Sequence, residues 1–86
     1  MEIVYKSEAL LDIDYWKASG NKRVQQKISE LIEDIRAHPK VGIGKPEQLK
    51  FELSGKWSRR IDRKNRIIYE IKDNQIDILS LRGHYL

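Results

Sequence analysis

The hydrophobic periodicity of this 86-residue chain changes at one loop. Before the loop, over residues 22–36, apolar side chains recur every three or four positions, which predicts an amphipathic helix packed on a core. After it, four runs have the composition of strands and are separated by connections short enough for antiparallel hairpins. These runs are LKFEL, KWSRRI, RIIYEI and QIDILSL. The loop itself, PKVGIGKPEQ, contains two glycines and two prolines, which favour neither a helix nor a strand.

The residues before this helix predict a strand and another helix. EIVY is typical of a short strand, Ser7 is a candidate N-cap, and a helix is expected from there to about Ser19, where Gly20 interrupts it. The whole order predicts a single α+β domain over residues 1–86: a short N-terminal strand, two helices, and an antiparallel β-meander with the helices packed on one face of the sheet. The opposite face is expected to be at least partly open.

The last predicted strand, QIDILSL, should anchor the chain end in the sheet. Simple alternation places Ile76, Ile78 and Ser80 on one face and Asp77, Leu79 and Leu81 on the other. We therefore expect the C-terminal residues that follow it to be ordered.

Composition excludes several classes of function. The chain has no cysteine and two histidines, so a disulfide framework and a zinc site are not expected, and no metal or cofactor is predicted. No apolar run approaches the roughly 20 residues of a membrane span, and the N-terminus resembles no secretory leader. A cytoplasmic location without a membrane partner is the expectation.

Charge is distributed unevenly along the chain. Residues 1–38 carry six basic and seven acidic side chains, a net of −1, whereas residues 39–86 carry eleven and six, a net of +5. A basic C-terminal half is often found in a protein with a polyanionic partner, although such a run of charge is more often merely a solvated surface.

At four places a polar side chain stands where the pattern of a strand or a loop does not call for one. Glu47 ends the loop between Lys45 and Lys50, and Arg66 opens a strand. Arg59 and Arg60 are adjacent in a predicted strand, so they should point to opposite faces. His84 follows the last strand. Taken singly, Glu47 could be a surface ion pair, Arg66 a hairpin residue and His84 a chain-end residue.

Together these side chains are suited to RNA cleavage through the 2′-hydroxyl. That reaction needs a base for the hydroxyl proton, positive charge for the phosphorane, and an acid for the leaving 5′-oxygen. The other histidine, His38, lies at the predicted C-terminal end of a helix, where the dipole favours a cation, so we interpret it as a helix-end residue.

Five segments, in order, resemble one family. DYWKASGNK, GIGKPEQLK, LSGKWSRRI, RIIYEI and the terminal HY are similar to YoeB-like toxins of bacterial toxin–antitoxin systems, within the RelE superfamily of ribosome-dependent mRNA endonucleases. The resemblance implies a RelE-like fold and a metal-independent endoribonuclease. It also assigns roles to individual residues: Glu47 as general base, Arg66 as phosphate-binding arginine, His84 as general acid, Tyr85 as the aromatic that orients a base, Arg60 as a further substrate contact, and Lys50 as added positive charge.

The same resemblance implies partners. The substrate would be mRNA in the A site of the bacterial 70S ribosome, a YefM-like antitoxin would hold the toxin inactive, and the toxin would form a homodimer. Lys22, Arg23 and Lys27 on the second helix are candidate contacts to ribosomal RNA, or they serve solubility alone.

The sequence departs from the family pattern at two positions. Leu86 follows Tyr85, where members often end, and Gly83 stands where a bulky aromatic is common. We expect activity to survive both. Two alternatives without cleavage are a gyrase-poisoning inhibitor on the same fold and a plain RNA-binding module. Glu47 and His84 argue against the first, and the scarcity of aromatics against the second, since Trp16 and Trp57 are expected in the core or at its rim.

Overall fold

The computed structural model describes residues 1–83, so the expected order of the chain end and the predictions for His84, Tyr85 and Leu86 lie outside the described residues. The elements follow in the order β1 (Glu2–Tyr5), α1 (Ser7–Ser19), α2 (Lys22–Ala37), β2 (Glu47–Gln48), the 3₁₀ turn η1 (Phe51–Leu53), β3 (Lys56–Arg60), β4 (Arg66–Lys72) and β5 (Gln75–Gly83).

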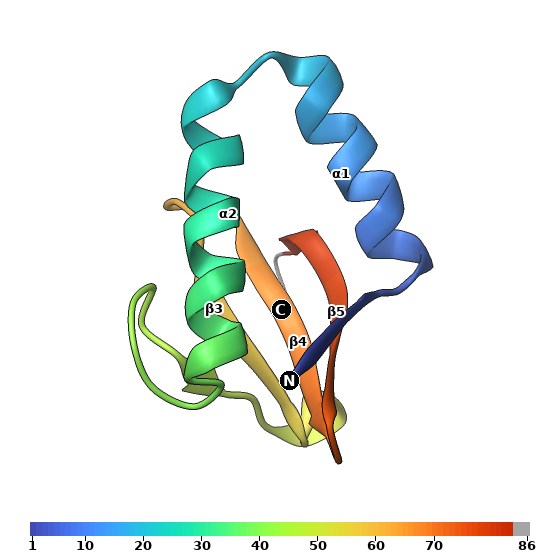
Figure 1. Cartoon of the computed structure of the whole chain (residues 1–86), viewed down its shortest axis with the longest axis vertical. Coiled ribbons are helices and arrows are strands. Elements are labelled where there is room, and N and C mark those ends of the chain that lie inside the picture. Colours follow the sequence, from blue (N-terminus) through green and yellow to red (C-terminus); the bar gives the residue numbers. More distant parts are fainter. Residues whose placement is uncertain (84–86) are drawn as a thin grey trace.

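The predicted α+β architecture is confirmed. The five strands form one sheet in the order β1-β5-β4-β3-β2. β1 pairs with β5 in parallel, and the other neighbours are antiparallel. Figure 1 shows the two helices on the same face of the sheet, joined at one end by the turn at Gly20. The sheet therefore has a covered face and a face that the helices leave open.

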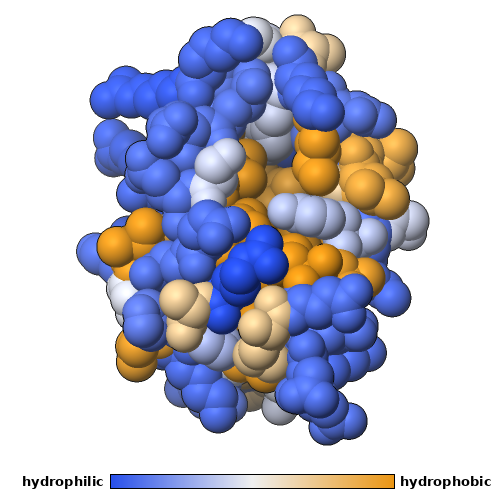
Figure 2. Space-filling model, in the orientation of Figure 1, coloured by the Kyte–Doolittle hydropathy of each residue, from blue (hydrophilic) through white to orange (hydrophobic). Residues whose placement is uncertain are grey.

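The core lies between the helices and the covered face of the sheet. It is built from aliphatic residues of α2 and of β4 and β5, closed by Trp16 of α1. Helix α1 is tied to β5 by two buried hydrogen bonds: Trp16 Nε1 donates to the Leu81 carbonyl at 2.8 Å, and the Leu81 N–H donates to Asp12 at 2.8 Å. Figure 2 shows apolar surface between the two helices, where a groove of about 230 Å³ opens over Leu81.

The alternation predicted for the last strand is wrong beyond Ile78. The register against β4 shifts twice, so that Tyr69 faces Ile78 whereas Ile68 faces Ser80. This bulge adds a residue to β5, and Leu81, not Ser80, joins Ile76 and Ile78 in the core. β5 then continues to Gly83, opposite Arg66.

Two local predictions about element ends are also wrong. Ser7 is the first residue of α1, and Lys6, with an extended backbone and no capping side chain, takes the N-cap position. LKFEL is not a strand: the strand lies earlier, at Glu47–Gln48, and Phe51 begins a 3₁₀ turn with φ of 58°. A left-handed residue cannot continue an extended chain, which ends the strand.

Helix α2 begins and ends much as predicted. The Asn21 side chain caps it by accepting from the Val24 N–H at 3.1 Å, and His38 is its C-cap. Within residues 1–83, no helix has the length and apolar character to cross a membrane.

Candidate active site

Glu47 and Arg66 meet although 18 residues separate them in the chain. The Arg66 guanidinium Nη1 lies 3.6 Å from the Glu47 carboxylate and also donates a long hydrogen bond of 3.4 Å to Ser58 Oγ. β3 makes this possible, because Ser58 pairs with Glu47 on one side and Arg60 with Arg66 on the other. The Glu47 side chain is 58% exposed and that of Arg66 24%, so a substrate can reach both.

Two further predicted cations lie around this pair. Arg60 is exposed and is the cross-strand partner of Arg66. Lys50 is exposed and lines the same shallow hollow as Glu47. The structure therefore brings one carboxylate together with cations of β3, of β4 and of the N-cap of η1, which is an arrangement suited to an anionic ligand.

The end of β5 lies beside Arg66. Gly83 is the cross-strand partner of Arg66, so the chain passes Arg66 immediately before His84. A side chain at Gly83 would place its Cβ 2.5 Å from Ser80 Oγ and 2.8 Å from an Ile68 methylene. At this register a residue larger than glycine fits at position 83 only if its neighbours shift.

Arg59 and Arg60 point to opposite faces, as predicted from their adjacency. Arg60 is exposed, whereas Arg59 is fully buried on the helix side. Its guanidinium donates to Asp34 of α2 at 2.6 Å, and its Nε donates to the Tyr69 hydroxyl at 3.1 Å. Tyr69 in turn donates to the carbonyl of Pro39 at 2.7 Å.

The same guanidinium organises the loop that leads to Glu47. It donates to the backbone carbonyls of His38, Val41 and Ile43, and Asp34 accepts from the Ile43 N–H at 3.0 Å. Gly42, with φ of 125°, passes so close to Asp34 that a Cβ would overlap its carboxylate. Arg59 is therefore a positioning residue for the loop. Its role was missed at the sequence level, although strand alternation already required one arginine to face the helices.

Two ionisable groups around Arg59 are shifted by their contacts. The hydrogen bond from Arg59 lowers the pKa of Asp34, and the Ile43 N–H contributes to the same shift against the opposing effect of burial. Burial raises the pKa of Tyr69, against the hydrogen bond from Arg59. At neutral pH Asp34 is thus a charged carboxylate paired with Arg59, and Tyr69 beside them is a neutral phenol.

Acid should weaken the fold through Asp34. Because its pKa is lowered in the folded state, its carboxylate stabilises the fold above the unfolded value of about 3.9, and this contribution is lost as pH falls through the lower folded value. We expect the free energy of unfolding, measured in urea, to fall below about pH 4. Asp34→Asn should be less stable at pH 7 and less sensitive to acid, whereas the control Asp14→Asn, at an exposed position of α1, should follow the parent. An unchanged acid profile in Asp34→Asn would contradict this.

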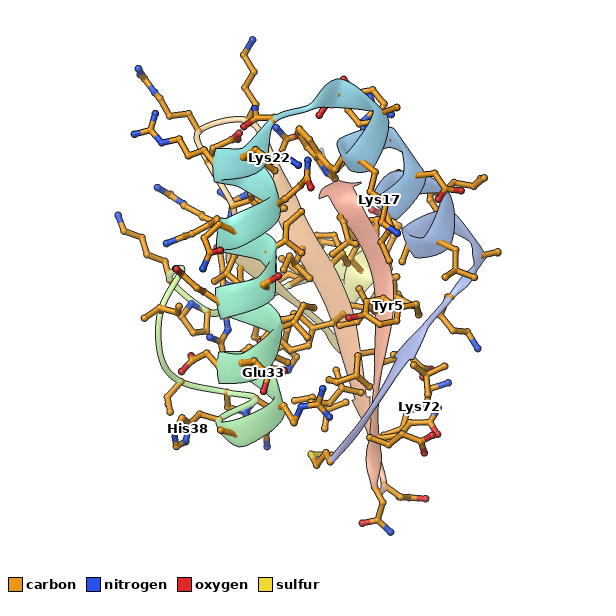
Figure 3. All side chains as sticks on the ribbon, turned by 45° about the horizontal axis from the view of Figure 1, so that its top comes forward. Tyr5, Lys17, Lys22, Glu33, His38 and Lys72 are labelled. Atoms are coloured by element: carbon orange, nitrogen blue, oxygen red, sulfur yellow. The ribbon has the colours of Figure 1, made fainter. Side chains whose placement is uncertain are left out.

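The three helix cations form a basic surface at the start of α2. Figure 3 shows Lys22 at the first turn of the helix, at the opposite end from His38. Arg23 and Lys27 line a hollow together with Arg63 of the β3–β4 turn. Ribosomal RNA as the ligand of this surface stays a prediction. Among residues 1–83, no three histidine, cysteine or acidic side chains gather as metal ligands.

Solved structures define the class of protein. The chain matches a YoeB/ParE toxin from Agrobacterium tumefaciens with a TM-score of 0.92 and 32% identity, over 99% of this chain and all of that one. It matches a YoeB dimer from Staphylococcus aureus with a TM-score of 0.88 and 38% identity, over 99% of this chain and 98% of the other. The predicted RelE-like fold is confirmed, and the protein is a bacterial toxin of the toxin–antitoxin class.

Sequence comparison gives the family. Residues 5–85 match the model of the YoeB-like toxin of bacterial type II toxin-antitoxin systems. Toxin YoeB of Escherichia coli strain K12 and that of Streptomyces coelicolor are each 44% identical over 85 residues, covering 99% of this chain and all of theirs. The chain belongs to the YoeB-like toxin family.

Proposed function

We propose that this toxin is a ribosome-dependent endoribonuclease that acts in the cytoplasm, cleaves mRNA in the A site of the bacterial 70S ribosome and thereby inhibits translation. One observation carries the proposal. Glu47 and Arg66, from different strands, lie 3.6 Å apart, and β5 ends opposite Arg66 at the residue before His84. A base, a phosphate-binding cation and an acid would then come together across β2, β4 and the end of β5.

The reaction follows from these groups. The 2′-oxygen of a nucleotide attacks the adjacent phosphorus while Glu47 accepts its proton, and the bond from phosphorus to the 5′-oxygen breaks as His84 donates a proton to that oxygen. The products are a 2′,3′-cyclic phosphate and a 5′-hydroxyl end. Arg66 binds the non-bridging oxygens, on which negative charge grows in the transition state. Arg60 and Lys50 add positive potential, and Tyr85 orients a base.

The proposal includes two protein partners. A YefM-like antitoxin would keep the toxin inactive, and two toxin chains would form a homodimer. Supporting this, a heterotetrameric YoeB–YefM complex from Staphylococcus aureus matches the chain with a TM-score of 0.86 and 38% identity, over 99% of this chain and 98% of that one. The Staphylococcus aureus YoeB structure noted above is described as a dimer.

Cleavage on ribosomes tests the function directly. We expect single-turnover cutting of A-site mRNA on programmed 70S ribosomes, with a cyclic or 3′-phosphate on the upstream product. His84→Gln should lower the rate by about 10²–10⁴-fold, the usual contribution of a general acid, while ribosome binding persists. Glu47→Gln should remove one ionisation from the pH–rate profile. A wild-type toxin that binds ribosomes and cuts nothing would overturn the proposal in favour of an RNA-binding module.

A further inference from the structure

A further hollow lies on the helix side of the sheet, where β5 and the β3–β4 turn meet α1. It has a volume of about 490 Å³ and is lined by Tyr15 and Trp16 of α1, Lys64 and Asn65 of the β3–β4 turn, and Arg82 of β5. Lys64 and Arg82 are both exposed. Among residues 1–83, no carboxylate lines this space, so its charge is positive. We name it the Arg82–Tyr15 hollow.

The Arg82 guanidinium is held in place by an aromatic ring. Its Cζ lies 3.5 Å from the centroid of the Tyr15 ring, a close cation–π contact. The Tyr15 ring in turn packs edge-on against Trp16, with centroids 5.1 Å apart, and Trp16 is fixed by its hydrogen bond to Leu81. This chain of contacts restrains a long side chain that would otherwise be mobile.

The restrained guanidinium keeps its donors for a ligand. Among residues 1–83, Arg82 is exposed and its guanidinium contacts the Tyr15 ring without a hydrogen bond or ion pair, so its N–H groups can donate to a ligand. Lys64 is placed nearby by a rigid turn, since the Lys64 and Asn65 N–H groups donate to Asp62 Oδ1 at 2.9 and 2.7 Å. A planar donor fork beside an ammonium group matches a phosphodiester.

This hollow lies on the helix-covered side of the sheet, opposite the face that carries Glu47 and Arg66, but at the same end of β4 and β5. Asn65 immediately precedes Arg66, and Arg82 immediately precedes Gly83, which is the cross-strand partner of Arg66. Cross-strand partners lie about 4.5–5.5 Å apart between Cα atoms. A nucleic-acid strand bound at Arg66 would therefore reach the hollow by passing around this end of the sheet.

We infer that the Arg82–Tyr15 hollow binds the mRNA strand next to the scissile nucleotide, with Arg82 and Lys64 on a phosphate. This inference rests on the proposed function of the neighbouring site. A guanidinium backed by an aromatic ring also presents its outer face for base stacking, a common feature of single-strand RNA recognition. Arg82 and Lys64 are thus binding residues, and Tyr15 is the positioning residue that orients Arg82.

Ribosome binding with and without A-site mRNA tests the inference. We would measure the Kd of the toxin for 70S ribosomes carrying an A-site codon with a 2′-O-methyl group at the scissile nucleotide, and for ribosomes whose mRNA ends at the P-site codon. The Kd without A-site mRNA divided by the Kd with it reports the contact with mRNA alone. We expect Arg82→Gln to reduce that ratio about tenfold, with unchanged affinity for ribosomes lacking A-site mRNA.

Matched variants separate the roles. Tyr15→Leu should reduce the ratio as well, whereas Tyr15→Phe, which keeps the ring, should restore it. Lys64→Gln should reduce it and lower the slope of the logarithm of this ratio against the logarithm of salt concentration by about 0.7 in magnitude. Lys40→Gln removes one exposed charge from the loop after α2, at the far end of that helix, and should leave the ratio unchanged.

The Kd ratio of Arg82→Gln decides whether the Arg82–Tyr15 hollow binds mRNA. An unchanged ratio in Arg82→Gln would overturn the inference, and an equal loss of affinity for both kinds of ribosome would assign the hollow to ribosomal RNA. The proposed function is judged separately, by cleavage of unmodified mRNA with the wild-type toxin. Normal cleavage together with an unchanged ratio would refute this inference alone.

Discussion

Replacing Arg66 by lysine is expected to lower the single-turnover rate of mRNA cleavage on programmed ribosomes by about 10²–10³-fold. The guanidinium fork can bind two phosphate oxygens and still lie 3.6 Å from Glu47. Lysine supplies a single ammonium group without the planar fork, so it cannot bind two phosphate oxygens and also lie beside Glu47. The measurement is the cleavage rate at saturating toxin, because a variant that only binds ribosomes more weakly would cleave at the parental rate there.

Arg63→Lys is the matched control for this experiment. Arg63 is an exposed arginine on the neighbouring turn and lines a different hollow, so the same exchange should leave the saturating rate within about twofold. Equal rates for Arg66→Lys and the parent toxin would remove Arg66 from the proposed mechanism. Because the Arg66 side chain is partly exposed, stability should change little in either variant.

Arg59→Met is expected to cost about 3–5 kcal/mol in the free energy of unfolding. Methionine fills much of the buried volume but leaves the Asp34 charge and the carbonyls of Val41 and Ile43 without their donor. Urea unfolding would measure the loss. The total stability of such a domain is of the order of 5–15 kcal/mol, so a large fraction of the variant molecules would be unfolded in mild denaturant.

The adjacent arginine supplies the control for Arg59. Arg60→Met removes the same charge from an exposed position and should change stability by less than about 0.5 kcal/mol. The double variant Arg59→Met, Asp34→Leu should recover part of the loss, because the uncompensated carboxylate is then gone. Equal stabilities of Arg59→Met and Arg60→Met would contradict the role assigned to the buried arginine.

Periodicity predicted most of the fold because each element carries a local pattern. The apolar stripe of α2 and the paired runs of β3 and β4 are visible within short windows of sequence. Two features are not local. Phe51 adopts a left-handed backbone although nothing in LKFEL signals it, and the β5 bulge arises where the strand meets β4 and the core. Alternation alone therefore placed Leu81 on the wrong face.

In the candidate site, too, residues that belong to a local motif were predicted, and contacts between distant parts of the chain were not. Family motifs indicated Glu47 and Arg66, and the structure brings them together. The partners of Arg59 lie 10 to 25 residues away in the chain, so residue types could not reveal which loop it would organise. Likewise, the contact between Arg82 and Tyr15 depends on the packing of α1 against β5, which no sequence spacing specifies.

The pairing of β1 and α1 with β5 also has a consequence for biosynthesis. The first strand finds its neighbour in the last, and the first helix is anchored to Leu81. A nascent chain emerging from the exit tunnel thus holds its N-terminal elements without a partner until β5 has been released. Closing such distant contacts is slow relative to local folding. The toxin consequently acquires its folded form after translation of β5, not during synthesis of the segments before it.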